Sequence, residues 1–293
     1  MAFAFAGAVV LLPKAGATAR GGVIQVVAAE NVWGSIASQL GGRRVHVSSV
    51  IDSPATDPHD YEPTAADARS LADAQLVILN GVGYDPWAPK LIAANPVHGR
   101  IVLTVGDLVG VKPGGNPHRW YSPADVRKVI DEIVRDYSQL DPPDAAYFRR
   151  QRTSFETHGL AQYRGLIASI RRTYGGVPVG ASESVFEPLA QALGLKLLTP
   201  ASFLKAISEG SEPTAADKST IDRQIAARQI EVWVYNSQNS TPDVSRITDD
   251  ARKRGIPVTT VTETLTPATA TFQDWQSSQL RALAAALAKA AVR

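Results

Sequence analysis

The sequence predicts an α/β protein made of two lobes with parallel sheets, joined by a single long backbone helix. Short apolar runs rich in β-branched residues alternate with amphipathic segments, the spacing typical of parallel sheets. This alternation occurs once before residue 122 and again after residue 175. Between the two halves, the stretch from Asp144 to Tyr174 has no proline and only two glycines. It therefore indicates a stiff connector helix, roughly 45 Å long at about 1.5 Å per residue.

Four strands are expected in the first half, separated by helices and loops. Polar residues mark where two of the helices begin: Thr64 with Asp67 as its capping partner, and Ser122 followed by Pro123. The expected strands are 23–28, 45–51, 75–80 and 101–104, and the expected helices are 32–40, 64–74 and 122–139.

The second half repeats the alternation and ends in an apolar helix whose spacing predicts docking on a sheet. The expected strands are 177–181, 196–199, 230–235 and 257–261, and the expected helices are 185–193, 215–229, 242–254 and 274–291. A loop rich in Ser, Glu and Gly is expected after residue 199. We therefore expect an N-terminal lobe over 20–122, a helical segment that includes the connector over 123–174, and a C-terminal lobe over 175–293.

The apolar run from Ala2 to Leu12 has the length of the hydrophobic core of a signal peptide and is too short to span a membrane. Small residues follow at Ala17 and Ala19, in the arrangement of a cleavage site. We expect a signal peptide over 1–19 and an exported protein, in the periplasm or at the cell surface. A buried first strand is the alternative, because no basic residue precedes the run.

The composition narrows the class of function. The 293 residues include 44% apolar and 20% charged side chains with a net charge of +2, which gives no indication of nucleic-acid binding. The chain has no cysteine, so disulfides, thiolate metal sites, cysteine nucleophiles and a lipidated cysteine are excluded for it. Glycine-rich phosphate loops, G-x-S-x-G and H-E-x-x-H are absent as well, and we expect no enzyme activity.

Two turns of similar composition contain the first candidate ligands. In Asp57–Pro63 and in Asn116–Pro123, a Pro-His pair is followed by an aromatic residue and a second proline. Prolines on both sides favour an ordered turn, so His59 and His118 are candidates for two halves of one site. A loop histidine on its own is more often a surface residue. His46, His98 and His158, in other contexts, are interpreted as structural or surface residues.

Two carboxylates complete the candidate site. Glu183 and Glu263 each follow an expected strand of the second half, as His59 and His118 follow strands of the first. The carboxyl ends of parallel strands are where such folds bind ligands, so a cleft between the lobes would bring the four together. Simpler alternatives remain: Glu183 as the cap of the helix that follows, and Glu263 as an ordinary loop acid.

At this point the chain resembles the metal-binding solute receptors of ABC transporters, in the zinc and manganese branch. The resemblance rests on five segments within roughly residues 24–290: DPHDYEPTAADA, NGVGYDPW, NPHRWYSPADV, SEGSEPTAAD and FQDW. It implies that His59, His118, Glu183 and Glu263 hold a divalent metal, Zn²⁺ or Mn²⁺, as a transported ligand in the cleft between the lobes. It also implies delivery to a membrane permease, a monomer and no nucleic-acid partner.

The metal itself is left open by this donor set. Glu183 stands where many zinc receptors have a third histidine, and Glu263 where the family commonly has aspartate. Two imidazoles and two carboxylates suit tetrahedral Zn²⁺, or Mn²⁺ if the carboxylates bind through both oxygens. Two other classes are alternatives: a metal-dependent hydrolase, in which the same donors would activate water, and a receptor for a non-metal solute.

Overall fold

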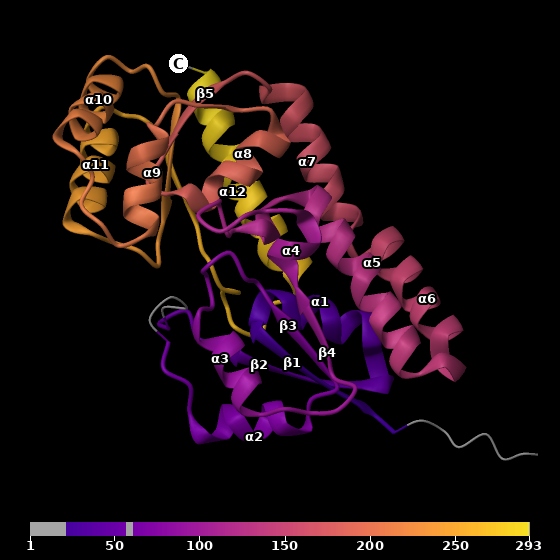
Figure 1. Cartoon of the computed structure of the whole chain (residues 1–293). Helices are drawn as coiled ribbons and strands as arrows, with labels where there is room; N and C mark the ends of the chain where they lie inside the picture. Colours follow the sequence, from indigo (N-terminus) through magenta and orange to yellow (C-terminus); the bar gives the residue numbers. More distant parts are fainter. Residues whose placement is uncertain (1–21, 57–60, 293) are drawn as a thin grey trace, which may run out of the picture.

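The structure of the protein is a computed structural model that describes residues 22–56 and 61–292. It contains two four-stranded parallel sheets, one in each lobe, as the repeated alternation predicts (Figure 1). The predicted signal peptide and His59 lie outside the described residues. None of the helices in the described part is long and apolar enough to cross a membrane.

The N-terminal lobe is built on a sheet in the order β2-β1-β3-β4, with every neighbouring pair parallel. All four side chains of β3 are buried, as expected for a central strand covered on both faces. Thr64 and Asp67 form the predicted reciprocal cap of α2. The elements are β1 (Ile24–Glu30), α1 (Asn31–Gly41), β2 (Val45–Ile51), α2 (Ala65–Asp73), β3 (Leu76–Leu79), α3 (Trp87–Ala94), β4 (Ile101–Thr104) and α4 (Val105–Val109).

The C-terminal lobe repeats this plan with the order β6-β5-β7-β8, again all parallel. The expectation of a loop after residue 199 is wrong for its first part, because a helix, α9, begins at Ala201. Phe203, Leu204 and Ile207 lie on one face of it and are buried. The elements are β5 (Pro178–Ala181), α8 (Glu187–Leu193), β6 (Lys196–Leu197), α9 (Ala201–Ser208), α10 (Ala215–Ala226), β7 (Val232–Asn236), α11 (Pro242–Lys253), β8 (Val258–Val261) and α12 (Phe272–Ala291).

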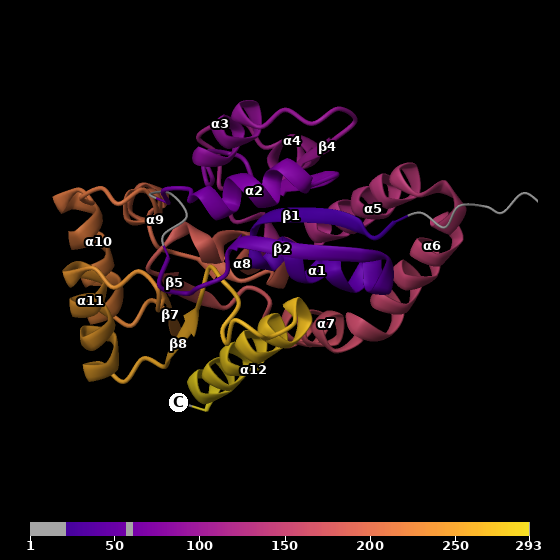
Figure 2. The same cartoon turned by 90° about the horizontal axis from the view of Figure 1, so that it is seen from below.

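The connector runs along one side of the molecule, opposite α10 and α11 (Figures 1 and 2). It comprises α5 (Pro123–Leu140), α6 (Ala145–Ser154) and α7 (Ala161–Tyr174), and a π-helical turn at Phe155–Gly159 divides the single helix expected over 144–174. Phe155 comes seven positions after the buried Phe148, but the buried Tyr163 comes eight positions after Phe155. Two α-helical turns take about 7.2 residues, so the wider π turn absorbs the excess and keeps these aromatic rings on the core side.

The last helix, α12, joins the two lobes. It packs against α7 and against β7 and β8 of its own sheet, as predicted, and its first turn also reaches α1 of the N-terminal lobe. There the backbone N–H of Phe272 donates to Ser35 Oγ at 2.9 Å, and the side-chain amides of Gln39 and Gln273 are hydrogen-bonded to each other. The carboxyl ends of the two sheets are therefore held facing one another.

Candidate metal centre

The strand order of the second sheet explains how three polar side chains meet. Glu183 lies two residues after the end of β5, Asn236 is the last residue of β7, and Glu263 lies two residues after the end of β8. Because β7 lies between β5 and β8, its carboxyl end lies between the segments that carry the two glutamates. The sheet therefore presents two carboxylates with an amide between them.

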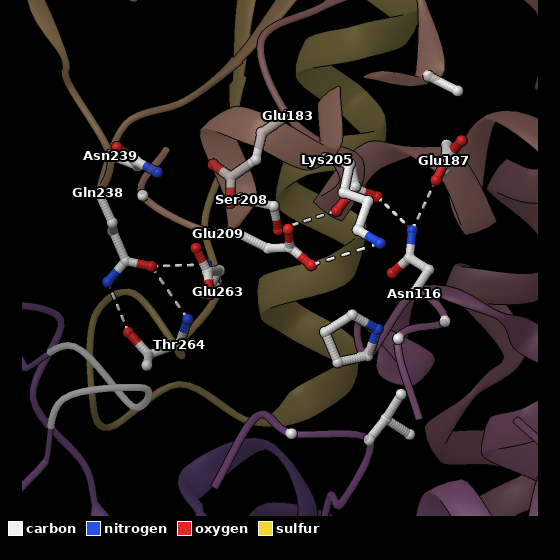
Figure 3. Close-up of a pocket in the computed structure, with 18 of the residues that line it drawn as sticks. Asn116, Glu183, Glu187, Lys205, Ser208, Glu209, Gln238, Asn239, Glu263 and Thr264 are labelled. Atoms are coloured by element: carbon white, nitrogen blue, oxygen red, sulfur yellow. Dashed lines mark hydrogen bonds and ion pairs between the residues drawn. The ribbon is translucent and has the colours of Figure 1, made fainter. Parts of the chain in front are cut away.

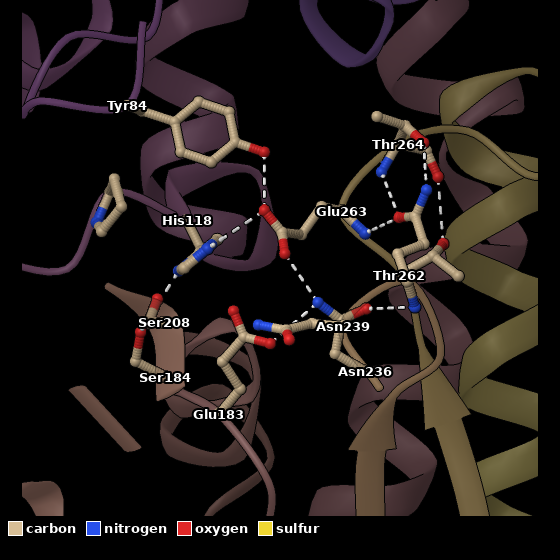
Figure 4. A network of polar contacts seen from close by, with 12 residues as sticks. Tyr84, His118, Glu183, Ser184, Ser208, Asn236, Asn239, Thr262, Glu263 and Thr264 are labelled. Atoms are coloured by element: carbon tan, nitrogen blue, oxygen red, sulfur yellow. Dashed lines mark hydrogen bonds and ion pairs between the residues drawn. The ribbon is translucent and has the colours of Figure 1, made fainter. Parts of the chain in front are cut away.

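The N-terminal lobe adds an imidazole to this group. His118 lies in the turn before α5, and one ligand atom from each of His118, Glu183 and Glu263 lies within 4.8 Å of the others (Figure 4). The shortest measured approach is 3.6 Å, between His118 Nε2 and Glu263 Oε2. His118 and Glu183 are buried and Glu263 is half-buried. The structure thus brings together three of the four residues predicted from the sequence, while the fourth, His59, lies outside the described part.

The hydrogen bonds of Asn116 fix the orientation of the His118 ring. Asn116 Nδ2 donates to the carbonyl of Ser184 and to Glu187 Oε2, so Asn116 Oδ1 faces His118. That oxygen accepts the backbone N–H of His118 and lies 3.0 Å from His118 Nδ1. The proton therefore sits on Nδ1, and the lone pair of the buried Nε2 points at the carboxylates. No described residue is hydrogen-bonded to His118 Nε2, as expected of a ligand atom.

The two glutamates are held close enough to perturb each other. Asn236 Nδ2 donates to Glu183 Oε2 at 2.9 Å and to Glu263 Oε1 at 2.6 Å. Burial, and next the negative charge of Glu263, raise the pKa of Glu183 to about 8. Two carboxylates this close do not both ionise readily without a positive charge between them. A divalent cation bound between them would supply that charge.

The structure tests one interpretation of Glu183, that it caps the helical turn that follows it. It occupies the position before the short helical turn Ser184–Phe186, where a capping residue would stand, but its side chain makes no capping hydrogen bond. The carboxylate turns instead toward Asn236 and the cluster (Figure 4). The cap interpretation is therefore wrong for the side chain.

Tyr84 is a neighbour of the cluster that we did not single out from the sequence. Its hydroxyl donates to Glu263 Oε2 at 2.8 Å, and burial, followed by the charge of Glu263, raises the pKa of Tyr84 well above its usual value. It is therefore a hydrogen-bond donor at neutral pH. Asp85 shapes the loop beneath it, because its carboxylate accepts the backbone N–H groups of Asn80 and Gly81. The only sequence signal was the segment NGVGYDPW, to which no site role was assigned.

The cluster opens into a cavity of about 710 Å³ between the lobes (Figure 3). Its walls include Asn116 from the N-terminal lobe and Glu187, Lys205 and Glu209 from the C-terminal lobe, with Glu183 and Glu263 at its inner end. The predicted cleft is therefore present, and the carboxylates can be reached from it.

The chemistry of the three donors fits a transition metal. Around one zinc ion, nitrogen and oxygen donors lie at about 2.0–2.2 Å, which places them roughly 3.3–3.6 Å apart in a tetrahedron. The 3.6 Å between His118 and Glu263 already meets this spacing. His46, His98 and His158 are exposed and outside the cluster, in agreement with their interpretation as surface residues.

Comparison with known proteins places the chain in a family. Residues 26–286 match ZnuA, described as "Zinc-uptake complex component A periplasmic". The chain is 24% identical over 228 residues to the "Zinc-binding lipoprotein AdcA" of Streptococcus pneumoniae serotype 4, covering 69% of this chain and 43% of that protein. It is 22% identical over 244 residues to the "Manganese ABC transporter substrate-binding lipoprotein PsaA" of the same organism, covering 77% and 76%. The chain thus spans less than half the length of the first relative.

Solved structures show the same fold. The Mn-bound periplasmic metal-binding protein from Candidatus Liberibacter asiaticus superposes with a TM-score of 0.72 at 20% identity, covering 89% of this chain and 98% of that one. The protein FpvC from Pseudomonas aeruginosa, in complex with Mn²⁺, superposes with a TM-score of 0.73 at 21% identity, covering 91% and 98%.

Proposed function

The chain belongs to the family of the periplasmic component A of the zinc-uptake complex, and on that premise we propose that it is a receptor for a divalent transition metal, zinc or manganese. It binds the ion outside the cytoplasmic membrane and delivers it to the membrane permease of an ABC transporter. Its role is binding and not catalysis. The observation that carries the proposal is the buried cluster of His118, Glu183 and Glu263 at the inner end of the cleft between the lobes.

In this proposal the ion is the cargo, and four side chains hold it. His118 binds through Nε2, and Glu183 and Glu263 each contribute a carboxylate oxygen. His59 is the fourth ligand, as the paired Pro-His turns suggest. Two glutamates balance the charge of one divalent ion, so the loaded cleft can close without burying net charge.

Metal analysis of the protein tests this function directly. We expect about one zinc or manganese ion per chain after purification without chelator. Removing the metal should lower the melting temperature, because a ligand at a hundred times its Kd adds about 2.7 kcal/mol of stability.

His59→Ala and His118→Ala should each remove most of the bound metal. His98→Ala, a change of an exposed histidine, is the matched control and should leave the metal content unchanged. Metal-free protein that neither zinc nor manganese stabilises would exclude the proposal.

A further inference from the structure

Asn236 is the residue that links the two glutamates of the site. It is fully buried at the end of β7, and its side-chain amide contacts carboxylates on both sides. It is neither charged nor one of the predicted ligands. Its role follows from which of its atoms face which partners.

The backbone determines the orientation of this amide. Asn236 Oδ1 accepts the backbone N–H of Gln238 at 3.0 Å, so Nδ2 must face the cluster. An amide nitrogen carries two hydrogens, and here one is donated to Glu183 Oε2 and the other to Glu263 Oε1. Both donors are therefore used, one on each carboxylate.

Each carboxylate consequently has one oxygen turned toward β7. Glu263 shows this most clearly: Oε1 faces Asn236, while Oε2 faces His118 Nε2 and accepts from Tyr84 (Figure 4). Binding a metal through both oxygens would require the carboxylate to rotate, which would break its bond to Asn236. The backbone of Glu263 is held as well, because Gln238 Oε1 accepts its N–H.

We propose that Asn236 is a positioning residue that determines metal specificity, holding Glu183 and Glu263 to one metal-facing oxygen each and thereby selecting zinc over manganese. This inference rests on the proposed function and names the metal that the same site takes. Zinc is satisfied by four donors in a tetrahedron. Manganese prefers more oxygen donors and a larger coordination number, which two single-oxygen carboxylates do not provide.

The test compares zinc and manganese affinities in the wild type and in Asn236→Leu, which removes both donors and keeps a side chain of four heavy atoms branched at Cγ. The ratio of the manganese Kd to the zinc Kd should fall by roughly tenfold or more, the scale of one hydrogen bond to a charged group. The matched control is Ser237→Ala, which changes the exposed neighbour and should leave the ratio unchanged. Loss of affinity for both metals in equal proportion would show a merely structural role and overturn the proposal.

Coordination geometry supplies a readout that stability does not affect. Cobalt(II) in the wild-type site should give the intense visible absorption of a four-coordinate ion, and Asn236→Leu should weaken it as the carboxylates become bidentate. If Asn236→Leu does not fold, Asn236→Ala removes the same donors without filling the space.

A measurement on the wild type alone also tests the proposal. X-ray absorption of its zinc complex should show four donor atoms around the metal, and five or more would overturn the proposal. Wild-type protein that binds no metal would instead refute the proposed function itself.

Discussion

Replacing Glu183 by glutamine should make the metal-free protein more stable at neutral pH, although it removes a proposed ligand. Glu183 is 2% exposed, and its pKa is raised to about 8, first by burial and then by the charge of Glu263. In the unfolded chain its pKa returns to the ordinary value of 4.5. Between these two values the folded state retains a proton that the unfolded chain releases. The free energy of unfolding therefore falls as the pH rises through this window.

The size of the effect follows from the same shift. One proton accounts for up to about 1.36 kcal/mol per pH unit, so the wild type loses roughly 2–3 kcal/mol between pH 5.5 and 7.5 from this group. Glutamine cannot ionise and lacks this loss. Relative to the wild type, Glu183→Gln should gain on the order of 5 °C in melting temperature across that range. Below about pH 4.5, where both states of the wild type are protonated, the loss is absent.

Thermal unfolding with excess chelator, at constant ionic strength and at several pH values, measures this difference. Glu209→Gln changes an exposed glutamate at the outer part of the same cavity and should follow the wild-type profile. The reasoning is refuted if Glu183→Gln shows the same pH slope as the wild type, or if it is the less stable protein at pH 7.5.

Three further predictions follow from the contacts around the site. Metal affinity should rise with pH and approach a tenfold increase per pH unit below about pH 8, because the ion displaces the proton held by the Glu183–Glu263 pair. Calorimetry in buffers of different ionisation enthalpy measures the number of protons released. Asn116→Ala should weaken metal binding about 10–100-fold by freeing the His118 ring. Glu187→Ala removes only one of the two acceptors of Asn116 Nδ2 and leaves the carbonyl of Ser184, so it should weaken binding far less in titrations. Burial and the adjacent Asp85 raise the pKa of Glu30 well above its usual value, so at pH 7 the folded state holds a proton there that the unfolded chain releases. Glu30→Gln cannot ionise and should therefore raise the free energy of unfolding at pH 7, as Glu183→Gln does. Asp85→Asn, which loses an acceptor for a backbone N–H, should instead cost about 1–3 kcal/mol in denaturant unfolding.

Much of the fold was predictable because its strands have a local signature. Buried parallel strands such as Leu76–Leu79 are continuous apolar runs, and a cap such as Thr64 marks a helix start without reference to the rest of the chain. Helix α9 was missed because its apolar face spans only eight residues beside a segment rich in Ser, Glu and Gly. The π turn at Phe155–Gly159 depends on which side chains the core buries, which is a tertiary property.

The site was predictable to the extent that strand ends meet at one edge of a sheet. Glu183 and Glu263 could be selected because they are acids that follow strands, but strand order could not be read from the chain. Without the order β6-β5-β7-β8, nothing indicated that Asn236 lies between them. Tyr84 and Asn116 were missed for a related reason, since neutral polar residues in loops are common and their role depends on their partners in space.

The division of the site between the lobes ties metal binding to protonation. Both carboxylates, together with Asn236, belong to the C-terminal sheet, whereas His118 and Tyr84 come from the N-terminal lobe. If the lobes separate, Glu263 loses its contact with His118, and the acid pair that remains with Asn236 can again hold a proton in place of the ion. A metal ion bound between the lobes, as we propose, would remove that proton and relieve the repulsion between the acids. The arrangement that destabilises the metal-free protein would thus be the one that favours metal capture. Release of the ion at neutral pH should then be accompanied by uptake of about one proton.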